Sequence, residues 1–387
     1  MLLDYELKHY NIRILLYMLL LSGIGVMAIY SATNQNRSMM ERQIVGALVG
    51  LALAVALSLI DYHRLMKLSP LVYVFCIGLL VATLLTGNSS GIARRWLVLP
   101  AIGQIQPSEF VKAGLVLFFS WLLTKLHESV NRLPVLALIA AAFALPAALI
   151  VRQPNLSTVL VMTVMMVCLV FVAGLGWRWI CGIVAVLAPV VGLAVYLIQF
   201  DLLPSFLQPY QINRIKTWLN KEGNAELYYQ QENSIMAIGS GQLWGKGFNT
   251  TQIASVKNGN FLSVEESDFI FAIIGEELGF VGCVVVICLT LLLVYECLMM
   301  AGRSKDLAGR LFCAGMGSWI AFQSFTNIAV ATGVFPNTGL PLPFISYGVS
   351  SLLSLYIGMG VVLNVSLQRK TNERDEARPL LGRRASA

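Results

Sequence analysis

Ten long apolar stretches constrain what this chain can fold into. They run over residues 13–31, 44–60, 71–86, 107–124, 134–151, 156–174, 179–199, 269–299, 308–332 and 344–367. A helix of about 20 apolar residues crosses a hydrocarbon core of about 30 Å. The sequence therefore predicts an all-α polytopic membrane protein with about ten transmembrane helices. Because 71–86 is short and 308–332 contains many small and polar residues, nine or eleven spans remain open.

The overall composition agrees with a membrane protein. Hydrophobic residues make up 57% of the chain and charged residues 12%, about half the charge of a soluble domain. We interpret residues 1–368 as a single transmembrane domain, and 369–387 as a disordered basic cytoplasmic tail. Residues 200–267 lack an apolar stretch and are too long for a simple connection, which predicts a large extracytoplasmic loop between spans 7 and 8. No cleavage site follows the first stretch, which predicts a retained helix.

The distribution of Lys and Arg predicts the orientation. If the N-terminus is cytoplasmic, most basic residues of the short loops and tail fall on the cytoplasmic side, as the positive-inside rule requires. We therefore expect both termini in the cytoplasm. The net charge of +7 reflects this bias and the basic tail, which suits acidic lipid headgroups better than nucleic acid.

Carboxylates in and beside an apolar stretch are the first candidates for chemistry. Asp268 stands at the mouth of the stretch 269–299, and Glu276 and Glu277 lie inside it. A charge at the bilayer centre costs about 2.5–3.5 kcal/mol, so a chain keeps one only for a reason. In a straight helix Glu276 would lie about 12 Å deeper than Asp268.

A second charged group lies at the start of the fourth stretch. Pro107 suits a first helical position, and Glu109 and Lys112 are three residues apart, so they share a helix face. Two interpretations are open: a capping acid with a snorkelling lysine, or an ion pair lining a polar cavity. The preceding residues Arg94, Arg95 and Trp96 favour the cavity.

Polar residues also gather in the other loops that are predicted to face outward. Asn155 lies in the turn 151–158, and Lys246 lies within the glycine-rich segment 237–249, which does not have the P-loop pattern. Ser346 and Tyr347 lie in a segment rich in Pro and Gly, and such backbone is tolerated at membrane depth only against protein or a wet cavity. The seven Cys residues show no metal-ligand spacing, so we predict no metal site. Together the loops predict one polar vestibule that opens outward.

The order of these segments resembles the SEDS family (shape, elongation, division and sporulation) of the RodA, FtsW and SpoVE type. The segments that carry the resemblance are 95–96, 106–112, 153–154, 237–247, 267–279 and 339–351. The resemblance implies a peptidoglycan glycosyltransferase in the bacterial cytoplasmic membrane, polymerising lipid II at the outer face. It also implies a class B penicillin-binding protein and other elongasome or divisome membrane proteins as partners. The segments 242–248 and 276–279 favour the RodA type within this family.

The resemblance also assigns residues. The essential aspartate of the family falls on Asp268, and its substrate-binding residues fall on Glu109, Lys112, Arg95 and Trp96. The chain has Asn155 where the family usually has Asp, Glu266–Ser267 in place of His–Thr, and Val349 in place of Gly. At Asn155 the charge that the family usually carries is absent.

Lipid II polymerisation needs a base and cations. A carboxylate that accepts the proton of the sugar hydroxyl accelerates such a step by about 10²–10⁴-fold, and Asp268 is the candidate. Candidates for binding the pyrophosphate are Arg94, Arg95, Lys112, Arg214 and Lys246. We expect hydrogen bonds from Ser346 and Tyr347, supporting roles for Glu276 and Glu277, and no tightly bound cofactor, although a divalent cation (Mg²⁺ or Mn²⁺) can bridge the pyrophosphate. A lipid II flippase and an inactive scaffold are the alternatives.

Overall fold

The computed structural model describes residues 10–33, 36–90, 93–99, 103–199, 209–219, 225–250, 255–256, 259 and 266–368. Each predicted apolar stretch coincides with a helix. These helices are α1 (Ile12–Ala32), α2 (Arg37–Ser58), α3 (Tyr62–Thr86), α4 (Pro107–Leu126), α5 (Leu133–Arg152), α6 (Leu156–Val172), α7 (Trp177–Gln199), α10 (Ile270–Arg303), α11 (Leu307–Ala331) and α12 (Val349–Leu367).

The helical fold class is confirmed. In the described part of the chain, seven helices are long and apolar enough to cross a membrane: α1, α2, α3, α4, α5, α10 and α12. Helix α6 is apolar but shorter. The total of ten spans stays a prediction, and the predicted tail 369–387 lies outside the described residues.

The structure adds elements that hydrophobicity alone does not predict. The loop before α4 holds a small antiparallel sheet with strand order β1-β2-β3, formed by β1 (Asn88–Ser90), β2 (Ala93–Leu99) and β3 (Gly103–Ile105). A short 3₁₀ helix, η2 (His127–Ser129), follows α4. The segment predicted as a large loop contains α8 (Pro209–Leu219) and α9 (Ala225–Ser240). Both helices mix polar with apolar residues, so neither resembles a membrane span in sequence.

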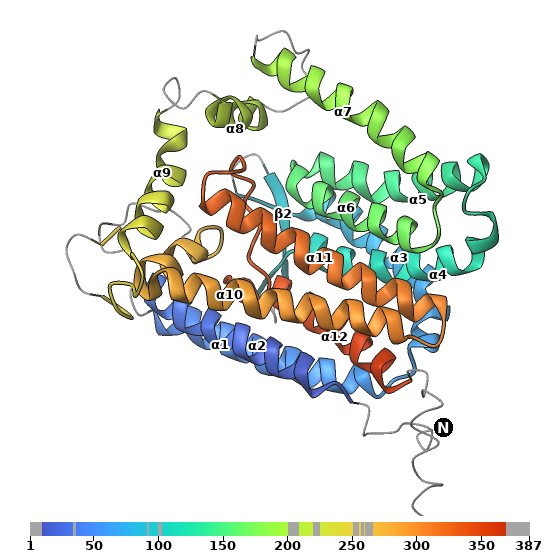
Figure 1. The fold of residues 1–387 in the computed structure, drawn as a ribbon, viewed down its shortest axis with the longest axis horizontal. Coiled ribbons are helices and arrows are strands. Elements are labelled where there is room, and N and C mark those ends of the chain that lie inside the picture. Colours follow the sequence, from blue (N-terminus) through green and yellow to red (C-terminus); the bar gives the residue numbers. More distant parts are fainter. Residues whose placement is uncertain are drawn as a thin grey trace, which may run out of the picture.

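Helix α12 lies at the centre of the bundle and packs against α2, α4, α10 and α11 (Figure 1). Close approach depends on small residues: a Cβ added to Gly360 would lie 2.7 Å from the carbonyl oxygen of Ala54. Small residues at helix crossings are typical of membrane bundles, in which packing rather than water exclusion drives association.

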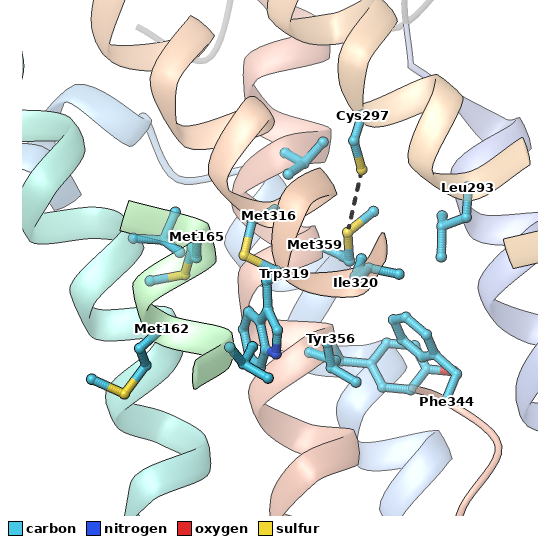
Figure 2. Close-up of a cluster of buried hydrophobic side chains, with 14 of the residues drawn as sticks. Met162, Met165, Leu293, Cys297, Met316, Trp319, Ile320, Phe344, Tyr356 and Met359 are labelled. Carbon is cyan, nitrogen blue, oxygen red and sulfur yellow. Dashed lines mark hydrogen bonds between the residues drawn. The ribbon is translucent and has the colours of Figure 1, made fainter. Parts of the chain in front are cut away.

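Large apolar side chains fill the space between α6, α10, α11 and α12. Figure 2 shows this cluster, which includes Met162, Met165, Leu293, Cys297, Met316, Trp319, Ile320, Phe344, Tyr356 and Met359. The hydroxyl groups of Ser22 and Tyr356 form a hydrogen bond of 2.9 Å, which satisfies the only polar atom of that ring. Flexible methionines fill irregular gaps well, so the cluster forms a packed base beneath the polar loops.

Helix α10 is broken near one end. Gly279 has φ +66° and ψ −163°, which is not a helical conformation. The part after the break, residues 280–303, is about 36 Å long and is enough to cross the hydrocarbon core. The structure does not contain a single straight helix through this segment: Glu276 and Glu277 lie in the short helical part that precedes the break at Gly279.

Candidate active site

Asp268 lies in the turn that precedes α10 and is half-buried. The hydroxyl group of Ser267 donates a hydrogen bond of 3.0 Å to its Oδ1. Gly339 (φ +67°) packs against the carboxylate, since a Cβ placed there would lie 3.2 Å from Oδ2. Burial raises the pKa of Asp268, while the Ser267 hydrogen bond and the nearby charges of Arg214 and Arg95 act in the opposite direction.

Two side chains hold the backbone that carries this carboxylate. The Nδ2 atom of Asn327 donates to the carbonyl oxygens of Asp268 (2.9 Å) and Leu340 (2.7 Å). The Oγ atom of Ser346 donates to the carbonyl of Ser267 (2.5 Å) and accepts a hydrogen bond from the backbone N–H of Leu342 (2.7 Å). The loop after α11 is thereby tied to the Asp268 turn.

Tyr347, next to Ser346 in the loop after α11, takes part through its backbone. Tyr347 contributes its backbone N–H, which donates to the carbonyl of Glu266 at 2.8 Å, and its side chain packs against the hydrophobic core. Asn327 was not among the site residues predicted from the sequence. The feature that could have identified it is a polar amide inside the apolar stretch 308–332.

The predicted cations occupy different places. On β2, Arg95 donates through Nε to the carbonyl of Gln153 (3.2 Å) and through Nη2 to that of Pro154. Arg214, on α8, lies with its Nη1 3.9 Å from the position that a Gly339 Cβ would take. The backbone of Arg94 lies in β2, and its side chain lies outside the described residues. Trp96 pairs with Asn88 across the sheet and is half-buried.

Glu109 and Lys112 form the predicted ion pair, with 2.8 Å between Oε1 and Nζ. The two side chains are 2% and 0% exposed, so the pair lies inside the protein. Lys112 Nζ also donates to Oε1 of Gln323 at 2.8 Å and lies 4.9 Å from the ring centroid of Trp319. Gln323 Nε2 donates to the carbonyl of Pro341 at 2.8 Å, which connects the pair to the loop that packs against Asp268.

Asn155 caps the N-terminus of α6, where its Oδ1 accepts a 3.4 Å hydrogen bond from the backbone N–H of Thr158. Asn and Asp serve equally well at this position. The cap therefore gives a physical reason why the chain keeps its local fold without the usual Asp.

Lys246 forms an ion pair with Glu276, with 2.6 Å between Nζ and Oε1. The same Oε1 accepts a hydrogen bond from the backbone N–H of Val256 at 2.8 Å. Glu277 accepts a hydrogen bond from the hydroxyl group of Ser31 on α1. Both glutamates thus connect α10 to neighbouring segments.

Several buried acceptors around the loop after α11 have no hydrogen-bond partner within the described ranges: Glu109 Oε2, Asn327 Oδ1, Asn337 Oδ1 and Thr338 Oγ1. Buried polar atoms normally have partners. Their concentration here marks a place that water or the hydroxyl groups of a ligand can satisfy. In the part of the chain that the structure describes, no group of three or more His, Cys, Asp or Glu is arranged to hold a metal ion.

These features define a polytopic helical membrane protein with a half-buried carboxylate that the charges of Arg214 and Arg95 reach. Comparison with known proteins identifies the family. The chain belongs to the FtsW, RodA and SpoVE family of cell cycle proteins, whose family model matches residues 12–371.

Named relatives resemble the chain over nearly its full length. Peptidoglycan glycosyltransferase MrdB of Escherichia coli is 31% identical over 363 residues, covering 94% of this chain and 95% of the relative. The probable peptidoglycan glycosyltransferase FtsW of Trichlorobacter lovleyi is 31% identical over 379 residues, 94% of each chain. Stage V sporulation protein E of Bacillus subtilis is 32% identical over 377 residues, covering 92% of this chain and 96% of the relative.

Solved structures show the same fold. A chain of a peptidoglycan synthase complex that coordinates polymerization and crosslinking matches with a TM-score of 0.77 and 29% identity, covering 94% of this chain and 99% of that one. The rod shape determining protein RodA of Thermus thermophilus matches with a TM-score of 0.67 and 28% identity, covering 94% and 98%.

Proposed function

We propose that this chain is a peptidoglycan glycosyltransferase that polymerises lipid II, with Asp268 as the general base. The family and the enzyme class follow from the relatives. The observation that carries the residue assignment is the environment of Asp268, a half-buried carboxylate with a raised pKa beside Arg214 and Arg95.

In this reaction Asp268 accepts the proton of the sugar 4-hydroxyl group of one lipid II. The hydroxyl oxygen forms a bond to the anomeric carbon of the lipid-linked glycan, and the bond from that carbon to the pyrophosphate oxygen breaks. Burial strengthens a carboxylate as a base because it raises the carboxyl pKa. Ser267 and Asn327 hold Asp268 in position.

The leaving pyrophosphate requires positive charge. Arg95 and Arg214 are the best placed of the predicted cations, because both act on Asp268, and Trp96 follows Arg95 on β2. Lys246 bonds to Glu276 and Lys112 to Glu109, so we assign both lysines supporting roles. Mg²⁺ or Mn²⁺ entering with the substrate would share the phosphate oxygens with these groups.

We further propose that both termini face the cytoplasm and that Asp268 faces the outside, because the basic residues of the loops fall on the opposite side. A class B penicillin-binding protein is the proposed partner. The similar chain of the peptidoglycan synthase complex supports this partner, since that complex couples polymerization to crosslinking. We keep the RodA-like assignment as a proposal, although relatives of the RodA, FtsW and sporulation types are about equally similar.

The test is polymerisation of labelled lipid II by the chain in nanodiscs with its cognate penicillin-binding protein. Asp268→Asn keeps the shape and removes the base, so we expect a loss of about 10²-fold or more. Glu266→Gln is the matched control, a half-buried carboxylate two residues away. Because the charge of Glu266 raises the pKa of Asp268, this variant should move the acid limb of the pH–rate profile to lower pH and keep the rate above that limb within a few-fold of wild type.

Two results would contradict the proposal. If Asp268→Asn made glycan as fast as wild type, Asp268 would not be the base. If wild-type chain made no glycan but moved lipid II across vesicle membranes, transport would be the function.

A further inference from the structure

The turn after α9, residues 241–248, is fastened to the break in α10 (Figure 1). Its backbone pairs with the groups that the break leaves without helical partners. The hydrogen bonds run from Phe280 N to Gln242 O (2.8 Å), Val281 N to Leu243 O (3.2 Å), Lys246 N to Glu276 O (2.9 Å) and Gly247 N to Glu277 O (3.0 Å). Irregular backbone beside a membrane is stable only when its polar groups are paired in this way.

Two glycines let the backbones touch. Gly245 (φ +81°) would place a Cβ 2.1 Å from the carbonyl oxygen of Glu277, and Gly279 would place one 2.3 Å from the nitrogen of Gly245. The ion pair between Lys246 and Glu276 adds a side-chain link. The turn is therefore fixed to α10, and its height in the membrane is that of the break.

The length of α10 sets this height. Arg303, at the other end, is the basic residue of the last turn, and we place one edge of the hydrocarbon core there because a charged side chain avoids the hydrocarbon. Phe280 lies about 35 Å from it along the helix, or about 32 Å along the membrane normal with a typical tilt. The core is about 30 Å thick and the bilayer with headgroups about 40–45 Å. The break therefore falls in the headgroup layer, a few Å beyond the core.

The turn presents large apolar side chains at this level. Trp244 is 76% exposed, and Leu243 and Phe248 are each about half exposed. Below them, Phe280 and Val284 continue an exposed apolar surface down α10, which faces lipid in a membrane-spanning helix. Trp is favoured at membrane–water boundaries, where its ring is half in lipid and half in water.

We propose that residues 241–248 form an interfacial membrane anchor. In this arrangement Leu243, Trp244 and Phe248 insert at the boundary between headgroups and acyl chains, in the leaflet on the Asp268 side. The anchor fixes the height of the short helical part of α10 before the break, and so that of Asp268 at its start. This inference does not depend on which reaction Asp268 performs.

The test uses the tryptophan fluorescence of the full chain in nanodiscs. The chain has seven Trp residues, so the difference between wild type and Trp244→Phe isolates the Trp244 emission. The quenchers are phosphatidylcholines brominated near the headgroup or near the bilayer centre, and iodide in the water. Trp319→Phe supplies the shielded reference, because that ring is fully buried.

We expect the Trp244 emission to lose most of its intensity with lipids brominated near the headgroup and less with the deep bromines. Iodide should have little effect, and the Trp319 emission should resist all three quenchers. Strong quenching by iodide with none by bromolipid would overturn the proposal, because it would place Trp244 in water and not in the lipid boundary. Stronger quenching by the deep bromines would overturn the interfacial height.

Discussion

The buried ion pair between Glu109 and Lys112 makes a prediction that separates structural from functional roles. Lys112→Met keeps the length of the side chain but removes its charge, and Glu109→Gln keeps the shape of its partner but removes the other charge. The single variant Lys112→Met leaves an unpaired carboxylate, whereas the double variant leaves two neutral side chains.

The magnitude follows from the geometry. Lys112→Met removes two hydrogen bonds of 2.8 Å, to Glu109 and Gln323. Glu109 Oε1 then loses its partner, and Oε2 has none within the described residues. Breaking a buried pair from one side costs about 3–5 kcal/mol, while replacing both charges is often close to neutral. The double variant should therefore recover about 3 kcal/mol relative to Lys112→Met.

The assay measures the free energy of unfolding in mixed micelles for the wild type, both single variants and the double variant. Lys125→Met is the matched control on the same helix, because this lysine is exposed and, among the described residues, contacts Trp121 alone, through a cation–π contact of 4.4 Å. Its loss should cost about 0.5–1 kcal/mol.

Two outcomes would refute the reasoning. An unfolding free energy for Lys112→Met within about 1 kcal/mol of wild type would mean that water reaches the pair. A double variant no more stable than Lys112→Met would mean that the unpaired carboxylate is not the source of the loss. If a stable double variant polymerises glycan, the role of the ion pair is structural. If it does not, at least one of the two charged groups also serves the substrate.

Further predictions concern single positions. Because the base must be ionised and burial raises the pKa of Asp268, polymerisation should slow as pH falls through that raised pKa. Arg214→Gln removes a cation that favours the carboxylate and should move the acid limb of the pH–rate profile to higher pH; an unmoved limb would contradict the placement. Asn327→Ala leaves two carbonyl oxygens without donors, so we expect a loss of about 1–3 kcal/mol and a lower kcat at unchanged KM. Gly279→Ala forces a side chain into a glycine-only conformation and should lower the unfolding free energy by about 1–3 kcal/mol. Asn155→Asp should unfold like wild type, while Asn155→Ala loses about 1 kcal/mol of capping.

The helices were predictable because the length of an apolar stretch is a direct physical requirement of the bilayer. The elements that shape the site are not apolar in this way. Helices α8 and α9 and the sheet before α4 are short and amphipathic, so their sequences are typical of a loop. The break at Gly279 has a local sequence signal, two glutamates followed by glycines. The turn whose backbone forms hydrogen bonds with the break, residues 241–248, lies more than thirty residues before Gly279 in the chain.

The side chains around Asp268 show why the site was only partly predictable. The sequence contains the carboxylate and its arginines as charged residues, which are conspicuous in an apolar chain. Asn327 and Gln323 act on backbone carbonyls of a loop whose path is set by tertiary packing. No spacing rule connects an amide on α11 to such a partner, so this part of the site required the structure.

The loop after α11 couples the two charged centres of the protein. Leu340 and Pro341 are adjacent, yet the carbonyl of the first accepts from Asn327, which also holds Asp268, and that of the second from Gln323, which also holds Lys112. A change at Lys112 that shifts Gln323 therefore also shifts Pro341. Through the peptide bond to Leu340, it reaches Asn327, which holds the backbone of Asp268. Loss of activity in Lys112→Met alone cannot assign substrate binding to the lysine, because a displaced loop would move the base. The double variant resolves this, since it removes the unpaired charge and leaves Gln323 able to hold Pro341.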